Sequence, residues 1–327
     1  MFCGHTDLVY SAFFSPDGSL VLTASGDCTA KIWNATSGEC LFTLPGVSPP
    51  LSAVFSPDGE SVLTSHGASP SISTIWSVAS GTRLLEVKHG DDKPYTTATF
   101  SFDGILLLTA GDRSAKIWSA RTGACLRTLS GHRQQVYRAM FSRDGKLVIT
   151  TSYCNIVTLW KSSSGALLMH FGEQHARWVP TAVFSPHGKW VLTVSGDSTA
   201  KIWSTTAKVW GTRKGICLRT FHGTGTDARA TLSRDGAVLL TVSDDCAAKL
   251  WNIASGVCMR MFTGHRGPYI HPALFPVFGM CVITGSRRDY TYRVWSCATE
   301  ECISVLAGHT ADVFTFVQAP VMDAMQD

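Results

Sequence analysis

Short alternating runs of apolar and polar residues, separated by turn residues, follow one another along most of the chain. Residues 9–14, Val-Tyr-Ser-Ala-Phe-Phe, are β-branched or aromatic in character and alternate in polarity, which is typical of a strand. A Ser-Pro-Asp-Gly turn follows at 15–18, where proline fixes φ and glycine supplies a positive φ. Three further short apolar runs complete the unit, at residues 20–23, 29–33 and 40–44. Helical periodicity is nowhere sustained, so the pattern predicts a four-stranded antiparallel meander joined by short hairpin loops.

This four-strand pattern recurs with a nearly constant period. Tryptophans mark the equivalent position of each repeat, at intervals of 42 to 48 residues: Trp33, Trp76, Trp118, Trp160, Trp203, Trp251 and Trp295. A period of about 20–50 residues indicates stacked modules rather than one irregular core. A four-stranded sheet with two apolar faces must pack against neighbouring sheets, and seven twisted sheets close radially. The sequence therefore predicts an all-β fold, a seven-bladed β-propeller of four-stranded antiparallel blades.

The repeat spacing also predicts the domain organisation. Residues 1–310 are expected to form one propeller, with blades at approximately 4–45, 46–88, 89–130, 131–171, 172–222, 223–263 and 264–307. Residues 311–327 are expected to be a surplus first strand of an incomplete repeat and a tail, outside the propeller or poorly ordered. Because seven blades are complete without them, we expect blades 7 and 1 to pack face to face without an exchanged strand. The incomplete repeats at both ends lead to the hypothesis that the chain is a fragment of a longer repeat array.

Three motifs recur in a fixed order within the repeats. In the first repeat they are Gly-His at residues 4–5, Ser-Pro-Asp-Gly at 15–18 and Asp-Cys-Thr-Ala-Lys-Ile-Trp at 27–33. This combination resembles the WD40-repeat β-propeller family, and the resemblance covers residues 1–317. The residue after each tryptophan is Asn, Ser or Lys instead of the aspartate usual in that family. Since Asn and Ser can cap the same surface turn, the expected fold is unchanged.

The resemblance implies a buried hydrogen-bonded chain in each blade, from the tryptophan indole through a Ser/Thr hydroxyl and the Gly-His imidazole to the turn aspartate. Four blades offer all four side chains: His5, Thr23, Asp27 and Trp33; His175, Thr193, Asp197 and Trp203; His222, Thr241, Asp245 and Trp251; His265, Thr284, Asp289 and Trp295. In blade 3 the histidine is expected to be His89, blade 4 has Cys154 in place of the aspartate, and blade 2 has Pro70 there. The trio of His, Asp and Thr also resembles a catalytic relay, but an enzyme needs one such site and this trio recurs in blade after blade. We therefore expect a structural role for it and no enzymatic activity.

Charge and cysteine placement narrow the class of protein further. A net charge of +4 over 327 residues is too small to indicate a nucleic-acid or membrane surface. No apolar run approaches the ~18–20 residues that span a bilayer, and the N-terminus lacks the basic and apolar regions of a signal peptide. The 11 cysteines recur mostly in equivalent slots of different repeats, too far apart for disulfides, and none belongs to a cluster with zinc spacing. We expect free thiols, no metal, no cofactor, and a cytoplasmic or nuclear location.

In the WD40 family the binding surface is the narrow face, built from the loops around Gly-His and around the turn aspartate. Most variation between the repeats of this chain falls in those loops. The resemblance implies the following binding residues there: Tyr10, Leu51, Tyr137, Tyr153, Trp178, Tyr269, His271 and Arg288. Tyrosine, tryptophan and arginine dominate interface hot spots, and an arginine-rich rim favours acidic or phosphorylated ligands.

The sequence therefore predicts a non-catalytic scaffold or adaptor, a monomeric propeller that binds a protein or peptide and takes part in protein–protein interactions. An alternative stays open. The chain could be a regulatory propeller domain of a larger multidomain protein, such as a ubiquitin-ligase substrate receptor or a module attached to a catalytic domain.

Overall fold

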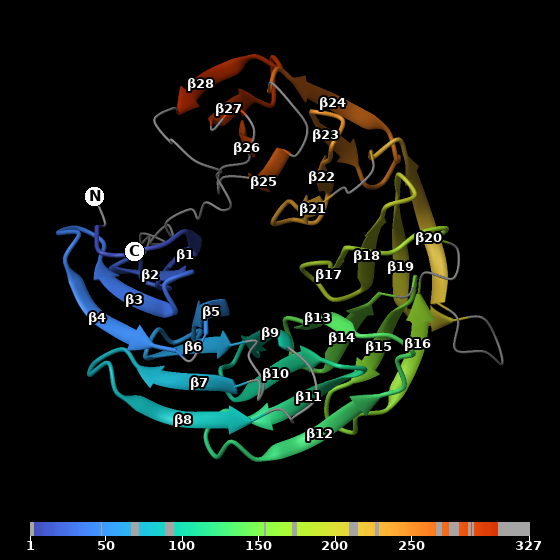
Figure 1. Cartoon of the computed structure of the whole chain (residues 1–327). Coiled ribbons are helices and arrows are strands. Elements are labelled where there is room, and N and C mark those ends of the chain that lie inside the picture. Colours follow the sequence, from blue (N-terminus) through green and yellow to red (C-terminus); the bar gives the residue numbers. More distant parts are fainter. Residues whose placement is uncertain are drawn as a thin grey trace, which may run out of the picture. The chain divides into compact units, whose positions relative to one another are not determined.

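The computed structural model describes residues 3–46, 48–66, 72–88, 95–153, 155–171, 175–208, 215–225, 229–265, 270–274, 281–286, 289 and 291–306. Over these residues all regular secondary structure is β, and the 28 strands form seven antiparallel four-stranded sheets (Figure 1). In every sheet each strand pairs with the next one along the chain. The predicted fold class, a seven-bladed β-propeller, is confirmed.

The strands of the first four blades have the following bounds: β1 (Val9–Phe14), β2 (Leu20–Ser25), β3 (Thr29–Asn34) and β4 (Cys40–Pro45); β5 (Pro50–Phe55), β6 (Ser61–His66), β7 (Ile72–Ser77) and β8 (Arg83–Lys88); β9 (Tyr95–Phe100), β10 (Leu106–Gly111), β11 (Ser114–Ser119) and β12 (Cys125–Ser130); β13 (Val136–Phe141), β14 (Leu147–Ser152), β15 (Val157–Lys161) and β16 (Leu167–Phe171). Those of the last three are β17 (Thr181–Phe184), β18 (Trp190–Ser195), β19 (Thr199–Lys208) and β20 (Gly215–His222); β21 (Arg229–Leu232), β22 (Val238–Val242), β23 (Ala247–Asn252) and β24 (Cys258–Thr263); β25 (Ile270–Leu274), β26 (Cys281–Ser286), β27 (Tyr292–Ser296) and β28 (Cys302–Leu306). Each strand carrying the repeat tryptophan is the third of its blade.

The chain divides into two compact units. The first unit holds strands β1 to β13 and the second unit holds β14 to β28. The packing of blade 7 on blade 1, and the single propeller domain over residues 1–310, stay predictions. Residues 311–327, with the expected surplus strand, lie outside the described residues.

The turn between the first and second strands is built by its serine and aspartate. In blade 1 the Ser15 hydroxyl donates to Asp17, and the Leu20 amide donates to Ser15 Oγ at 2.9 Å. Gly18 has a φ of 74°, a conformation that favours glycine. The hydrogen bonds from Ser15 and Ser19 lower the pKa of the Asp17 carboxyl. The same Ser–Asp bond recurs in blades 2, 3, 4 and 6, so the motif that repeats in the sequence is a local hydrogen-bonding device.

The core lies between the sheets. In the first unit, Trp76 of blade 2 packs with Leu22 and Ile32 of blade 1. In the second unit, Trp251 of blade 6 packs in the same way with Leu192 and Ile202 of blade 5. Trp118 and Trp295 repeat the arrangement on blades 2 and 6. Each of these four tryptophans therefore belongs to the core shared with the preceding blade, which explains why one blade needs its neighbour.

The outermost strands carry the exposed surface. Every residue of β28 is exposed, and β12 is exposed at every position except the buried Leu129. The ten cysteines of the described residues are free thiols. Within the same residues there is no helix of a length and hydropathy that would cross a bilayer.

Candidate functional site

In blade 1, four side chains form a hydrogen-bonded chain that begins in the core. The buried Trp33 indole N–H donates to Thr23 Oγ1 at 2.8 Å, and Thr23 Oγ1 lies 2.7 Å from His5 Nε2. His5 Nδ1 lies 2.7 Å from Asp27 Oδ2. A carboxylate can only accept a hydrogen bond, so Nδ1 donates to Asp27. These hydrogen bonds connect the Gly-His loop to the centre of the blade.

Blades 5 and 7 contain the same chain with similar geometry. In blade 5, Trp203 Nε1 donates to Thr193 Oγ1 at 2.7 Å, and His175 lies 2.8 Å from Thr193 Oγ1 and 3.1 Å from Asp197 Oδ2. The corresponding distances in blade 7 are 2.7, 2.8 and 2.9 Å, among Trp295, Thr284, His265 and Asp289. Burial lowers the pKa of both histidines, and the partner aspartates offset this only in part. The lowered pKa favours the neutral form of both imidazoles.

The turn aspartates remain ionised because they collect hydrogen bonds. Burial raises the pKa of Asp27, but hydrogen bonds from Thr29, His5 and the Thr6 amide outweigh it and hold that pKa well below its usual range. Asp197 follows the same rule, with Thr199 and the Ala176 amide among its donors. Each aspartate thus binds both a side chain and the backbone of the Gly-His loop. A repeated His–Asp–Thr set of this kind fixes loops.

The structure does not bring His222 into the chain of blade 6, and that expectation was wrong. His222 lies at the end of β20, opposite Thr199 in the sheet register of blade 5, and its side chain is exposed. The Trp251 indole still donates to Thr241 at 2.9 Å. Asp245 instead receives Lys249 Nζ at 2.6 Å, and the same ammonium donates to the Gly223 carbonyl at 2.7 Å. Lysine has taken the place of histidine as the group that joins the aspartate to the loop.

Blades 2, 3 and 4 keep the inner part of the chain. The indole of Trp76, Trp118 and Trp160 donates to a threonine at 2.8, 2.8 and 2.7 Å, respectively. The expected partners His89, Cys154 and Pro70 lie outside the described residues. Blade 2 has a buried histidine at another position, His66. Its Nδ1 atom lies 2.6 Å from the Ser48 carbonyl oxygen. His66 stands at the end of the second strand, where the other blades mostly have serine, and this departure marks it in the sequence.

Half of the predicted binding residues lie among the described side chains. Tyr10 is 42% exposed, Tyr153 57% and Trp178 40%, whereas Tyr137 is only partly exposed. Leu51 and His271 belong to β5 and β25, but their side chains are not among those described, and neither are Tyr269 and Arg288. Tyr10 and Tyr137 belong to the first unit, and Tyr153 and Trp178 belong to the second.

Tyr153 and Trp178 lie on two loops that are hydrogen-bonded to each other. Asn155 Nδ2, two residues after Tyr153, donates to the His175 carbonyl at 3.4 Å. Trp178 lies over the next turn, since a Cβ at Gly196 would come within 3.0 Å of its Nε1 atom. The Gly196 amide donates to the Trp178 carbonyl at 3.0 Å, which fixes the backbone beneath the indole. Arg177, next to Trp178, is exposed as well.

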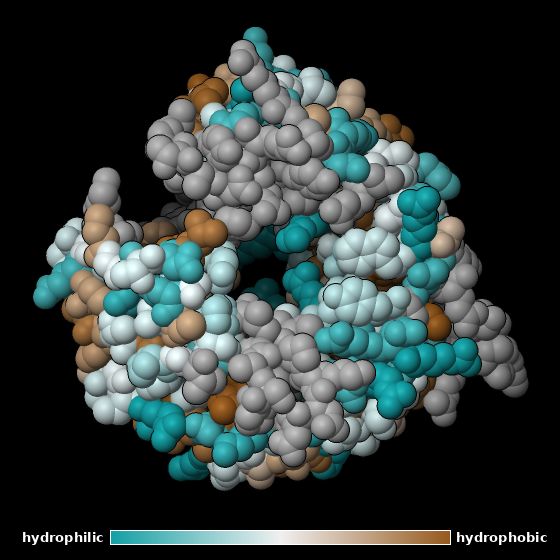
Figure 2. Space-filling view, in the orientation of Figure 1, coloured by the Kyte–Doolittle hydropathy of each residue, from teal (hydrophilic) through white to brown (hydrophobic). Residues whose placement is uncertain are grey.

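The surface over β14 to β16 has single exposed aromatic side chains rather than a broad apolar patch. Figure 2 shows hydrophilic side chains gathered over β14 to β16 on one face of the molecule, with hydrophobic residues as small separate spots. Among the described residues no group of three or more His, Cys, Asp or Glu side chains could hold a metal ion. Tyrosine and tryptophan, together with arginine, are enriched among protein-binding hot spots.

Sequence comparison places this arrangement in a known family. The WD domain, G-beta repeat family matches residues 1–34, 82–119, 123–161, 166–204 and 215–252, which together make up more than half of the chain. The chain therefore belongs to the WD40-repeat family. Propellers of this family bind proteins or peptides and generally act as non-catalytic scaffolds or adaptors.

Several curated proteins are similar to the chain over most of its length. Nuclear distribution protein PAC1 of Arthroderma benhamiae is 29% identical over 284 residues, covering 79% of this chain and 61% of the relative. Pre-mRNA-processing factor 19 homolog 2 of Arabidopsis thaliana is 30% identical over 236 residues, covering 66% of this chain and 43% of the relative. Apoptotic protease-activating factor 1 of Rattus norvegicus is 25% identical over 255 residues, covering 74% and 19%. The chain thus spans less than two thirds of the length of these relatives.

Proposed function

We propose that this protein is a non-catalytic scaffold or adaptor that binds a protein or peptide segment at the Gly-His and turn-aspartate loops of its propeller. The observation that carries the proposal is the pair of exposed aromatics, Tyr153 and Trp178, on two loops joined by the hydrogen bond from Asn155 to His175. The His175–Asp197 pair holds the backbone beneath them. Large aromatic side chains on a rigid backbone give contact area with little loss of conformational entropy on binding.

The partner segment is proposed to be acidic or phosphorylated. Arg177 lies beside Trp178, so a guanidinium accompanies the aromatic anchor. Arginine binds carboxylates and phosphates through paired hydrogen bonds. In the second unit, Tyr269, His271 and Arg288 are proposed to extend this surface. Tyr10, Leu51 and Tyr137 are proposed as binding residues on the loops of the first unit. The protein is further proposed to be a monomeric propeller in the cytoplasm or the nucleus.

Affinity capture with matched variants tests this function. We expect Tyr153→Ala/Trp178→Ala to lose the proteins that the unchanged chain retains from cell extract, as quantified by mass spectrometry. Leu218→Ala is the control, because Leu218 is 55% exposed on β20 of the same blade and lies outside the loops. Phosphatase treatment of the extract separates phosphorylated from acidic partners. An unchanged set of bound proteins with the double variant would refute the assignment of these loops.

A second candidate is that the propeller is a regulatory module of a larger protein, for instance a ubiquitin-ligase substrate receptor or a partner of a catalytic domain. The supporting observation is that the similar proteins are longer than their matched regions, which are 61%, 43% and 19% of their lengths. An immunoblot of the endogenous protein tests it. A band well above the 35.3 kDa of this chain supports the module, and a band at that mass contradicts it.

A further inference from the structure

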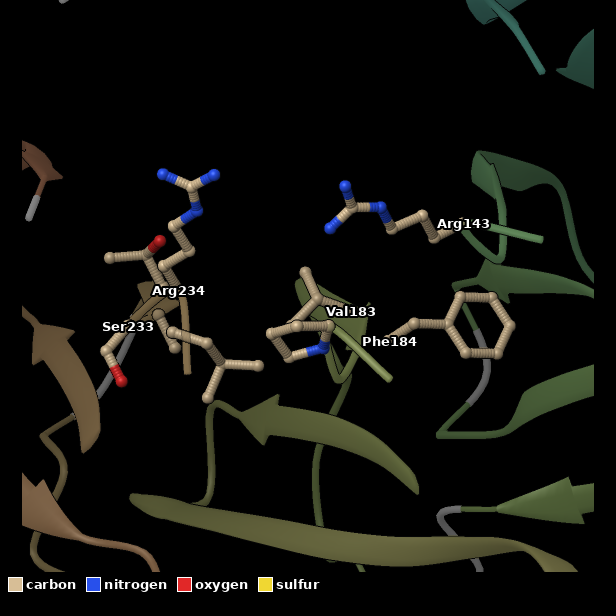
Figure 3. Close-up of a pocket in the computed structure, with 9 residues that line it drawn as sticks. Arg143, Val183, Phe184, Ser233 and Arg234 are labelled. Carbon is tan, nitrogen blue, oxygen red and sulfur yellow. The ribbon is translucent and has the colours of Figure 1, made fainter. Parts of the chain in front are cut away.

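A pocket lies at the end of β17 opposite the Gly-His loop, between the first strands of blades 5 and 6. It has a volume of about 340 Å³ and is open to solvent. All of its lining residues belong to the second unit: Arg143, Val183, Phe184, Pro186, Ala230, Thr231, Leu232, Ser233 and Arg234. In Figure 3, Arg143 and Arg234 rise on either side of Val183, with both guanidinium groups on the same side of the pocket. The pocket therefore combines an apolar wall with two arginines.

These arginines are departures from the repeat. The turn after the first strand reads Ser-Pro-Asp-Gly in blades 1 and 2 and Ser-Phe-Asp-Gly in blade 3, but Ser-Arg-Asp-Gly in blades 4 and 6. The turn folds through its serine and aspartate, which hydrogen-bond at 2.6 Å in both blades that carry arginine. The side chain between them is not needed for that geometry. Both Arg143 and Arg234 are exposed.

The three turns around the pocket carry more cations than carboxylates. The three turns at residues 142–147, 185–190 and 233–238 hold four cations: Arg143, Lys146, Lys189 and Arg234. They hold two carboxylates, Asp144 and Asp235, and both accept hydrogen bonds from their own turns. Blade 5, which lies between the two arginines, has His187 where the other turns have aspartate. The pocket thus lacks the carboxylate that the repeat would have placed beside it.

We propose that this pocket binds an acidic linear peptide of a partner protein, as a second surface separate from the loops of the proposed function. An apolar side chain of the peptide packs against Val183 and Leu232. Carboxylates on either side of it are bound by Arg143 and Arg234, since guanidinium groups hold carboxylates through paired hydrogen bonds. The apolar wall favours a peptide over a nucleic acid, whose phosphates would need a more continuous cationic surface.

Selection from a phage-displayed library of random peptides tests the proposal on the full chain. We expect the selected sequences to carry Asp or Glu on both sides of a Leu, Ile, Val or Phe residue. A labelled peptide from that selection is then titrated by fluorescence polarisation against Arg143→Glu/Arg234→Glu, and we expect binding at least about tenfold weaker. Arg113→Glu/Arg121→Glu is the charge-matched control, because both residues are exposed and belong to the first unit whereas the pocket is lined by the second, and it should bind nearly as the unchanged chain does.

Three results would overturn the proposal: no acidic residues in the selected peptides, equal weakening by the control pair, or displacement of the peptide by transfer RNA at lower concentration than by polyglutamate. Tyr153→Ala/Trp178→Ala should leave peptide binding unchanged. That variant separates the two surfaces, so loss of captured proteins with retained peptide binding supports both assignments independently. The two arginines are exposed, and a thermal unfolding midpoint near that of the unchanged chain shows that the pocket variant is folded.

Discussion

At the scale of single residues, Thr193 links the core of blade 5 to its surface loop. Its hydroxyl accepts the Trp203 indole N–H and is bound to His175 Nε2, and none of its surface is exposed. Thr193→Val keeps the shape but leaves a buried N–H and a buried ring nitrogen without partners. Because each unsatisfied buried group costs about 1–3 kcal/mol, we expect a loss of about 2–4 kcal/mol in the free energy of unfolding, measured with urea. Thr206→Val, at an exposed position of β19, is the control and should change it by no more than about 0.5 kcal/mol.

The neutral histidines predict a dependence of stability on pH. Burial lowers the pKa of His175 and His265 below the 6.5 of an unfolded chain. As the pH falls through 6.5 the unfolded state binds protons first, so stability is full above that value and declines toward the lower folded-state pKa. We expect the thermal unfolding midpoint to decrease as the pH is lowered from 6.5 to about 5. The double variant His175→Gln/His265→Gln should show a smaller fall. An equal fall in that variant would place the effect in other groups.

The fate of His222 shows what a motif can and cannot predict. The chain reads His-Gly at 222–223 instead of Gly-His, and strand pairing places His222 on the exposed edge of β20. Counting three residues from the buried aromatic, as from Phe262 to His265, leads from Phe221 to Thr224, which is buried. That spacing was visible in the sequence. The replacement of histidine by Lys249 was not visible in the sequence. Lysine recurs at this position of the motif, and only the conformation of its side chain decides whether it binds the aspartate and the loop carbonyl.

At the scale of the blade, the strands and turns could be predicted almost completely, because they rest on local patterns. Alternation gives the strands, Ser and Asp build the first turn, and the repeat period gives the number of sheets. The pocket beside β17 could not be predicted in this way. It depends on two arginines from different blades meeting in space, although their departure from Ser-Pro-Asp-Gly was readable in the sequence. Departures from a repeat indicate where to look, and only the fold shows which of them meet.

Blade 6 provides a test of the lysine that replaces histidine. Lys249 binds Asp245 and the Gly223 carbonyl, whereas the equivalent Lys31 of blade 1 donates to the exposed Thr43. Lys249→Met leaves the Asp245 carboxylate, whose side chain is 36% exposed, without its cation. We expect a cost of about 1–2 kcal/mol in the free energy of unfolding, moderated by solvent because the pair is partly exposed. Lys31→Met should cost less than about 0.5 kcal/mol, since His5 holds Asp27 in that blade. Equal losses in the two variants would mean that the lysine contributes no more than an ordinary surface charge.

At the scale of the whole molecule, neighbouring blades stabilise each other through the repeat tryptophans. Trp76, Trp118, Trp251 and Trp295 each bond a threonine of their own blade and pack in a core shared with the preceding blade. Stability in such arrays approximates a sum of repeat terms and nearest-neighbour terms. Here the tryptophan supplies part of the nearest-neighbour term. Each of these tryptophans extends from its own blade to the preceding one, so the contact between the two blades is asymmetric.

Hydrogen exchange of two matched variants tests whether each tryptophan stabilises the preceding blade as well as its own. Trp251→Phe removes the indole N–H bonded to Thr241 and part of the ring that packs with Leu192 and Ile202, at a cost of about 2 kcal/mol. We expect amide protection to fall in β18 and β19 of blade 5 as well as in β22 and β23 of blade 6. Trp76→Phe should act alike on β2 and β3 of blade 1 as well as on β6 and β7 of blade 2. The exposed Trp178→Phe serves as the control and should leave protection unchanged. If protection falls only in the blade that carries the substitution, the tryptophans stabilise their own sheets and the blades are coupled by other contacts.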